Sequence, residues 1–189
     1  MNRVFVDVDT LNDFFANGNL PVPNADEIRP VLAKLTKLAK DEKIPVLKLN
    51  DCHDGTEPEM SQNGGPFPLH CMKETTGAAS IIETANNKAK VFEKRTYDAF
   101  DRNLGNPDIE DWLKNNKVTE AWVYGLVGNI CVEAAVMGLL RRGIKVFVFE
   151  NAVAWMELEN GIFCKGIDNK ELSVKRMREA GAHFAVAKL

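Results

Sequence analysis

Residues 121–149, AWVYGLVGNICVEAAVMGLLRRGIKVFVF, decide the fold of this chain. The apolar run Ala121–Tyr124 reads as a buried strand. A helical pattern follows over Cys131–Arg142, and Gly143 marks its end. The next apolar run, Val146–Phe149, reads as a second buried strand. Continuous apolar strands separated by a helix indicate a parallel sheet that is covered by helices on both faces.

The same alternation extends over the rest of the chain. Apolar runs at positions 4–8, 45–49, 91–92 and 184–186 predict four more strands, and helical patterns predict helices over 28–39, 109–115 and 170–180. Before the first of these helices, Asn24 is a candidate cap, and Glu27 would complete a capping box. Pro30 is expected at the first position of the regular helix, where a missing N–H costs nothing.

The amino-acid composition limits the classes to which this protein can belong. The chain has 189 residues, of which 45% are hydrophobic and 27% charged, with a formal net charge of −3. These values are typical of one soluble globular domain over residues 1–189, and the absence of a basic stripe disfavours a nucleic-acid partner. The N-terminus does not read as a signal peptide, and the apolar runs are too short to span a membrane. Four irregularly spaced cysteines, including Cys164, favour a reducing cytoplasm over a disulfide framework.

One long segment, from about residue 50 to 76, has no clear periodicity. Structureless loops of that length in compact domains are usually functional or disordered. This loop holds Asp51, His53 and His70, which supply mixed oxygen and nitrogen donors. Such donors suit zinc, iron or manganese rather than calcium. We therefore expect a loop that binds a divalent metal, with zinc the first expectation and iron or manganese the alternatives.

The rest of this ligand set stays open at the level of sequence. Glu57, Glu59 or a water molecule could add a further ligand. Cys52 and Cys71 flank the proposed ligands and could compete for the metal, which would make a tetrahedral zinc site. Without a metal, the two histidines would be ordinary residues of a surface loop. His183, in the last predicted strand, is expected to be structural.

Reactive side chains follow four of the predicted strands. Asp9 follows the first, Asp51 and His53 the second, Lys94 the third and Cys131 the fourth. Ligands of open parallel sheets bind outside the carboxyl ends of the strands, so these side chains are expected to share one site. Cys131 is then the candidate nucleophile, with its pKa lowered by the helix start and by Lys94. Asp9 would carry the thiol proton to a leaving amine.

Each of these residues also has an ordinary structural interpretation. Cys131 could be a small buried hydrophobic residue, Lys94 a solvated lysine at a strand end, and Asp9 a turn or capping residue. Asp7 lies on the same strand face as Asp9. If both carboxylates are buried, their mutual repulsion would raise the pKa of one of them. Whether Asp7 serves the site stays open. Four strands delivering reactive groups to one edge favour the functional interpretation.

Two further features surround these positions. The segment 125–131 is a junction of strand, turn and helix that would aim free backbone N–H groups at a developing oxyanion. Phe14, Phe67, Tyr97 and Phe100 lie beside the reactive positions in the sequence and could sandwich a flat ring. Ordinary core or loop packing is the alternative for each of these aromatic residues.

Four motifs resemble those of a known family. They are DTLNDF at 9–14 with LPVP at 20–23, DCH at 51–53 with GGPFPLHC at 64–71, KRTYDAF at 94–100, and GLVGNICV at 125–132. On these motifs the chain resembles nicotinamidases of the isochorismatase-like cysteine hydrolase superfamily, from Val4 to about Val153. The loop motif with its two histidines is the most specific of the four.

The resemblance implies a fold, a reaction and a set of site residues. The fold is a three-layer α/β/α sandwich with a six-stranded, mostly parallel sheet, and the reaction converts nicotinamide to nicotinate and ammonia. Superfamily members often form oligomers, so a homo-oligomer is expected. The implied residues are the catalytic triad Asp9, Lys94 and Cys131; the metal ligands Asp51, His53 and His70; the oxyanion-hole N–H groups of Val127 and Cys131, after a cis peptide between Leu126 and Val127; and the substrate pocket residues Phe14, Phe67, Leu126, Tyr97 and Phe100.

The chain also departs from the family pattern. Leu11 stands where Gln is common, Gly128 and Asn129 replace a Thr followed by an acidic residue, and Asn151 stands where Asp is common. A further metal-loop histidine is absent, with Glu57 and Glu59 nearby. These changes leave the triad intact but leave the substrate open. A hydrolase of another small amide or N-carbamoyl compound is the alternative, and a metal- or ligand-binding module without catalysis is a third hypothesis.

Overall fold

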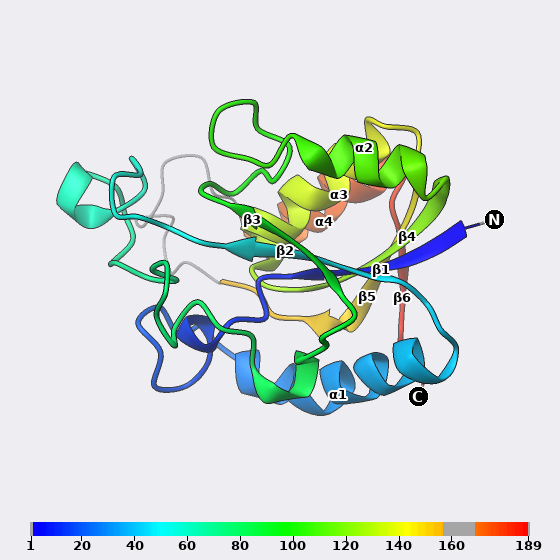
Figure 1. Ribbon diagram of the computed structural model, residues 1–189, viewed down its shortest axis with the longest axis horizontal. Helices are drawn as coiled ribbons and strands as arrows, with labels where there is room; N and C mark the ends of the chain where they lie inside the picture. Colours follow the sequence, from blue (N-terminus) through cyan, green and yellow to red (C-terminus); the bar gives the residue numbers. More distant parts are fainter. Residues whose placement is uncertain (1, 157–168, 189) are drawn as a thin grey trace.

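The computed structural model describes residues 2–156 and 169–188. Six strands form one sheet in the order β3-β2-β1-β4-β5-β6, and every neighbouring pair is parallel. In Figure 1, α1 covers one face of this sheet, while α2, α3 and α4 lie on the other, which confirms the three-layer α/β/α fold. The strands are β1 Asn2–Val8, β2 Val46–Asp51, β3 Lys90–Lys94, β4 Val118–Gly125, β5 Lys145–Val153 and β6 His183–Ala185; the helices are α1 Ala25–Asp41, α2 Asp108–Asn115, α3 Glu133–Leu140 and α4 Lys170–Glu179.

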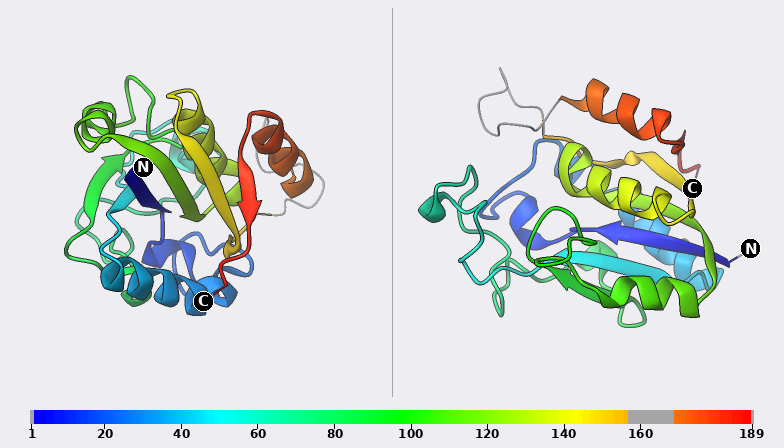
Figure 2. Two further views of the ribbon diagram at one scale, coloured as in Figure 1. Left: turned by 90° about the vertical axis from the view of Figure 1, so that its right-hand side faces the viewer. Right: turned by 90° about the horizontal axis from the view of Figure 1, so that it is seen from above.

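The direction of strand succession reverses between β1 and β4. From β1 the chain moves outward through β2 to β3, and it then returns to the other side of β1 for β4, β5 and β6. Both views in Figure 2 show helices on the two faces of the twisted sheet. A crevice is expected outside the carboxyl ends of the strands at such a reversal. Asp9 and Cys131 follow the two strands that flank it.

The helix α1 forms at the predicted place but begins in an unexpected way. Asn24 occupies the cap position with a left-handed φ of 59° and makes no side-chain cap hydrogen bond, so the predicted capping box is wrong. Pro30 lies inside the helix, whose first residue is Ala25, and not at its start. Asp26 and Glu27 place carboxylates in the first turn, where the helix dipole favours them. Apolar residues at helical spacing are buried against the sheet: Ile28, Leu32, Leu35 and Ala39.

The segment after β4 differs from the predicted regular helix. Residues Gly128–Val132 form a π-helical turn, and the α-helix α3 begins only at Glu133. Single π-helical turns are rare and occur frequently at functional sites. Cys131 therefore lies on a widened turn directly behind the strand end rather than at the start of α3. This turn is completely buried.

The long segment between β2 and β3 extends beyond the carboxyl ends of the strands, at the left of Figure 1. Isolated bridges organise it: His53 pairs with Met72, and Met60 with Phe67. Buried Asp13 holds it to the segment after β1, because its carboxylate accepts the backbone N–H of Cys71 at 2.7 Å. These contacts fix the loop that carries the candidate metal ligands.

Several minor predictions can also be placed. His183, which was expected to be structural, stacks on the ring of Phe147 with 5.1 Å between the centroids. Cys52, Cys71 and Cys131 are free thiols, and Cys164 lies outside the described residues. Among the described helices, none has the length and apolar content that crossing a lipid bilayer requires.

Candidate active site

Lys94 is the centre of a buried charged group at the ends of β1, β2, β3 and β4. Its Nζ lies 2.9 Å from Oδ2 of Asp9 and donates to Sγ of Cys131 at 3.5 Å. The same ammonium forms an ion pair with Asp51. All four side chains are buried. The structure thus brings together the three residues that were predicted as a triad.

The backbone explains how Asp9 reaches this group. The strand β1 ends at Val8, and Asp9 adopts a positive φ of 52°. Its N–H donates to the carbonyl of Leu49 at 3.0 Å, and its Oδ1 accepts the N–H of Asp51 at 2.6 Å. Asp9 is therefore tied to the end of β2 through both backbone and side chain.

Asp7 belongs to a different group. Its carboxylate pairs with Nζ of Lys48 at 3.1 Å and accepts from the hydroxyl of Thr10 at 2.7 Å. The predicted repulsion between Asp7 and Asp9 is not what shifts the pKa of Asp9. Burial and then the neighbouring Asp51 raise that pKa to about 7, and Lys94 opposes the shift.

The thiol of Cys131 contradicts one expectation. Its pKa was predicted to be low, but burial raises it well above the ordinary cysteine value, and the attraction of Lys94 only partly opposes this. Asp9 and Asp51 add to the rise because a thiolate would be a third negative group around one lysine. Burial lowers the pKa of Lys94, but Asp51 and Asp9 outweigh it and keep the ammonium charged. Attack by the thiol therefore calls for a nearby proton acceptor, and the carboxylate of Asp9 lies beside the same ammonium.

The turn around the cysteine is held by its own backbone. The carbonyl of Val127 accepts from the N–H groups of Ile130 and Val132 at 3.0 and 3.1 Å. The Leu126–Val127 peptide is cis, as the family resemblance implied. This arrangement presents Cys131 from the end of β4 toward Lys94.

Asp51, His53 and His70 converge in the loop beside this group. One ligand atom from each lies within 4.8 Å of the others. Nδ1 of His70 lies 2.8 Å from the carbonyl of Pro68, which leaves its Nε2 for a metal. Both ring nitrogens of His53 are buried without a hydrogen-bond partner. Buried polar atoms are rarely left unsatisfied, so this donor set fits a divalent cation.

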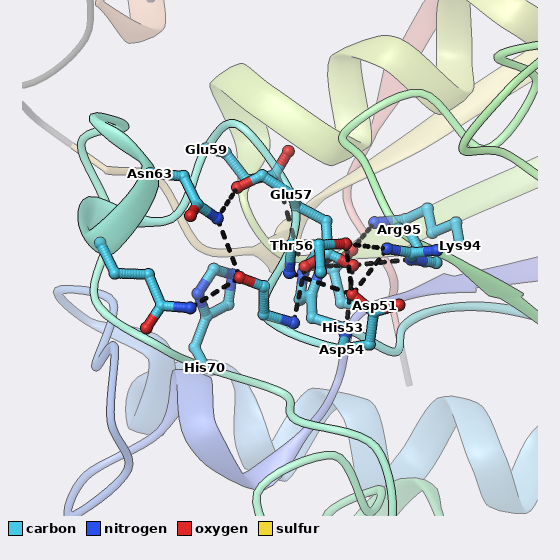
Figure 3. A network of polar contacts seen from close by, with 12 residues as sticks. Asp51, His53, Asp54, Thr56, Glu57, Glu59, Asn63, His70, Lys94 and Arg95 are labelled. Carbon is cyan, nitrogen blue, oxygen red and sulfur yellow. Dashed lines mark hydrogen bonds and ion pairs between the residues drawn. The ribbon is translucent and has the colours of Figure 1, made fainter.

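The structure separates the two candidate glutamates, and Figure 3 shows the network around them. Glu57 is already engaged, because it accepts from Nε of Arg95 at 2.6 Å and from the N–H groups of Asp54 and Gly55 at 3.1 and 2.9 Å. Oε1 of Glu59 has no hydrogen-bond partner and lies 3.7 Å from Nε2 of His53. Burial and then Asp51 raise the pKa of Glu59 to about 7. Of the two glutamates, Glu59 is therefore the one without an arginine partner, but it lies outside the groups of donors that converge within 4.8 Å.

The two competing cysteines do not join this cluster. Among the described residues, the groups of metal-type donors that converge within 4.8 Å are Asp51, His53 and His70, and also Asp9, Asp51 and Cys131. Neither group contains Cys52 or Cys71. The alternative of a cysteine-rich tetrahedral site is therefore not supported.

A small pocket adjoins the thiol of Cys131 and encloses about 10 Å³. Three of the predicted aromatic or apolar residues line it, namely Phe14, Phe67 and Tyr97. Leu126 and Phe100 are not among its described lining residues; Phe100 packs instead under the guanidinium of Arg142, 4.0 Å from the ring centre. The remaining lining residues are Leu20, Asp51, His70, Val127, Ile130 and Met156.

Sequence reasoning named some of these lining residues and missed others. Leu20 and Ile130 stand within the family motifs, so the motifs could have indicated them. Met156 follows β5 in a stretch with no recognisable motif, and nothing in the sequence pointed to it.

The chain is similar to known proteins in both sequence and fold. The family model described as the isochorismatase domain matches residues 3–187. A nicotinamidase of Escherichia coli (strain K12) is 26% identical over 182 residues, covering 83% of this chain and 85% of that protein. The fold superposes on the pyrazinamidase of Pyrococcus horikoshii in complex with zinc, with a TM-score of 0.85 at 23% identity and coverage of 98% and 99%. It also superposes on an N-carbamoylsarcosine amidase from Thermoplasma acidophilum, with a TM-score of 0.80 at 25% identity and coverage of 100% and 98%.

Proposed function

The chain belongs to the isochorismatase domain family, and from this premise we propose that it is an amidohydrolase that converts nicotinamide to nicotinate and ammonia. The observation that carries the proposal is the position of Lys94, whose ammonium contacts both the carboxylate of Asp9 and the sulfur of Cys131. This arrangement supplies a nucleophile, a proton carrier and a fixed positive charge in one buried place. The nicotinamidase of Escherichia coli among the relatives supports the same reaction.

The first half of the reaction acylates the cysteine. Sγ of Cys131 attacks the carboxamide carbon as Asp9 takes the thiol proton, and Lys94 offsets the negative charge on the sulfur. Asp9 then gives that proton to the departing amine, so that ammonia leaves and a thioester remains. A carboxylate whose pKa is about 7 can both accept and return a proton near neutral pH.

The second half releases nicotinate. Water attacks the thioester carbon while Asp9 accepts a proton from it, and the C–S bond breaks to restore the thiol of Cys131. In both halves the carbonyl oxygen becomes an oxyanion, and we assign its stabilisation to the backbone N–H groups of Val127 and Cys131. One such donor is typically worth about 3 kcal/mol.

The metal is proposed to be zinc, held by Asp51, His53 and His70 with Glu59 as the fourth protein ligand. Mixed imidazole and carboxylate donors suit zinc, and the similar pyrazinamidase of Pyrococcus horikoshii is described in complex with zinc. Bound there, the ion would supply a Lewis-acid anchor for the ring nitrogen of the substrate. Its ligand His70 and the nucleophile Cys131 line the same pocket.

The pocket wall favours an aromatic amide over the main alternative. An N-carbamoyl amino acid carries a carboxylate, and burying that charge away from the metal site requires a cationic side chain. The described wall of the pocket contains the rings of Phe14, Phe67 and Tyr97 and no arginine or lysine. A flat, uncharged ring suits such a wall better. The N-carbamoylsarcosine amidase among the structural relatives keeps the second substrate class worth testing.

Three broader expectations are part of this proposal. We expect a single domain over residues 1–189, a cytoplasmic location and a homo-oligomer. Sedimentation of the purified protein over a range of concentrations would test the last of these.

The experiment that tests the proposal compares Cys131→Ala with Cys52→Ala. Cys131→Ala should abolish release of ammonia from nicotinamide and leave the fold intact, as judged by circular dichroism. Cys52→Ala, which removes a partly exposed thiol outside the pocket, should retain turnover. Unchanged turnover in Cys131→Ala would refute the assignment. A parallel assay with an N-carbamoyl amino acid decides between the two substrate classes.

A further inference from the structure

Residues 154–156 run along the turn that carries the nucleophile. The N–H of Ala154 donates to the carbonyl of Gly125 at 3.2 Å, and the N–H of Gly128 donates to the carbonyl of Ala154 at 2.8 Å. The side chain of Asn129 then forms two hydrogen bonds with the backbone of Met156: Nδ2 donates to its carbonyl at 2.7 Å, and Oδ1 accepts its N–H at 3.1 Å. The segment after β5 is thus fastened to the nucleophile turn at both ends.

Gly128 makes room for this arrangement. A Cβ atom at position 128 would lie 2.4 Å from two ring carbons of Trp155, a separation that real Cβ atoms essentially never show. The indole therefore sits where a side chain would otherwise be, and Trp155 is itself buried. Gly128 and Asn129 are neighbours in this turn, and both contact residues 154–156.

The consequence for the site is the position of Met156. Met156 is buried and lines the pocket together with Cys131, Phe14, Phe67 and Tyr97. The pocket is small, with a volume of about 10 Å³, so the size of each lining residue should affect which rings fit.

We propose that Met156 is a specificity-determining residue, and that Asn129 is a positioning residue that holds Met156 against the nucleophile turn. This inference rests on the proposed function and narrows its substrate class. With Met156 held in the wall, the site admits the amide of a single, unsubstituted six-membered heteroaromatic ring. It excludes bicyclic or ring-substituted amides, which need the volume that the methionine side chain fills.

The kinetic test uses the ratio of kcat/KM for a bicyclic amide, quinoline-3-carboxamide, to that for nicotinamide. Met156→Ala should raise this ratio by about ten-fold or more, the scale on which pocket volume discriminates between substrates. Met156→Leu, which keeps the volume, should stay near the parent ratio. Asn129→Ala should shift the ratio in the same direction as Met156→Ala, although Asn129 lines no part of the pocket. A ratio that stays constant in Met156→Ala and Asn129→Ala, while both amides slow equally, would overturn the proposal.

Met177→Ala is the matched control. Met177 is a fully buried methionine of α4 that is absent from the described pocket wall. This variant should lose stability as a cavity forms but should leave the substrate ratio unchanged. If Met177→Ala changes the ratio as much as Met156→Ala does, the preference for nicotinamide depends on the overall stability of the protein and not on the residue that lines the pocket.

A second readout separates failure of this inference from failure of the proposed function. Alkylation of Cys131 by iodoacetamide and by the bulkier N-phenyliodoacetamide is followed by peptide mass mapping, which distinguishes it from the partly exposed Cys52. Met156→Ala should increase the rate with the bulky reagent relative to the small one. If the parent protein releases no ammonia from nicotinamide, the proposed function fails, and the alkylation ratio still decides the role of Met156. An unchanged alkylation ratio would overturn that role.

Discussion

Asp7 and Asp9, two residues apart in the chain, each pair with a buried lysine, but only the pair of Asp9 belongs to the candidate site. Asp7 of β1 pairs with Lys48 of β2 at 3.1 Å, and Asp9, just beyond β1, pairs with Lys94 of β3 at 2.9 Å. All four residues have exposed fractions of 2% or less. Neither distance nor burial therefore distinguishes the structural pair from the reactive one.

The surroundings of the two lysines do distinguish them. Lys48 donates to the hydroxyl of Ser80 at 2.7 Å and to the carbonyl of Thr84 at 3.2 Å. Apart from Asp7, these partners are uncharged, and we call Asp7–Lys48 the closed pair. Lys94 instead faces two carboxylates and a thiol, and its group opens into the pocket. The groups around Lys94 therefore include acids that can exchange protons beside the pocket, whereas the hydrogen-bond partners that Ser80 and Thr84 provide to Lys48 are neutral.

The largest expected effect separates the two aspartates. Asp9→Asn removes the proton carrier, and kcat on nicotinamide should fall by about 10³-fold, within the range for general acid–base groups. Asp7→Asn should leave kcat per folded molecule near the parent value. Both variants are assayed at a temperature at which circular dichroism shows them folded. A loss of kcat in Asp7→Asn equal to that in Asp9→Asn would remove the distinction between the pairs.

The next largest effect is a loss of folding stability when the Asp7–Lys48 pair is broken. Lys48→Met leaves the carboxylate of Asp7 buried without its cation, and the free energy of unfolding should fall by about 3 kcal/mol. Urea unfolding measures this change. The double variant Asp7→Asn with Lys48→Met should recover part of the loss, because no buried charge then remains unpaired. Equal stability of the parent and Lys48→Met would show that this pair contributes little to the fold.

Removing the metal should change the reactivity of the group around Lys94 and should leave the Asp7–Lys48 pair unaffected. The negative charge of Asp51 raises the pKa of the Cys131 thiol, and a cation bound to Asp51 would cancel that charge. At a fixed pH below the thiol pKa, alkylation of Cys131 should therefore be several-fold slower after chelation than in zinc-loaded protein. His70→Ala, which lacks a metal ligand, should show no such response to zinc. Identical rates with and without zinc in the parent protein would contradict the coupling.

The smallest effect tests the partners of the closed pair. Ser80→Ala removes one hydrogen bond from Lys48, while Asp7 and Thr84 remain as its partners. The free energy of unfolding should fall by about 1 kcal/mol, and kcat should not change. Thermal unfolding and the ammonia assay measure the two quantities on the same sample. A change in kcat without a change in stability would show that the Asp7–Lys48 pair contributes to the reaction, which contradicts its assignment as structural.

Much of this architecture follows from local pattern. Continuous apolar runs predicted all six strands, and the rule that ligands bind at strand ends predicted that Asp9, Lys94 and Cys131 would meet. The backbone near Asn24 and Pro30 could not be predicted in the same way. Asn24 has a left-handed φ and Pro30 lies within α1, and neither feature follows from residue preference alone.

The features that sequence missed depend on contacts between distant residues. The pKa of Cys131 is set by burial against the charge of Lys94, and the depth of burial is a property of the packed molecule. Arg95 engages Glu57, and this long-range contact distinguishes Glu57 from Glu59, whose Oε1 has no hydrogen-bond partner. Met156 lines the pocket, and Asn129, which lies 27 residues earlier in the chain, forms two hydrogen bonds with its backbone.

The most direct test of the account is an acid-quenched single turnover of the protein with nicotinamide, analysed by peptide mass mapping. The account predicts that a nicotinoyl group appears on the peptide that contains Cys131, that its appearance coincides with release of ammonia, and that it then decays as nicotinate forms. Ammonia released in the first turnover with the nicotinoyl group on a different residue, or with undiminished yield from Cys131→Ala, would contradict the account.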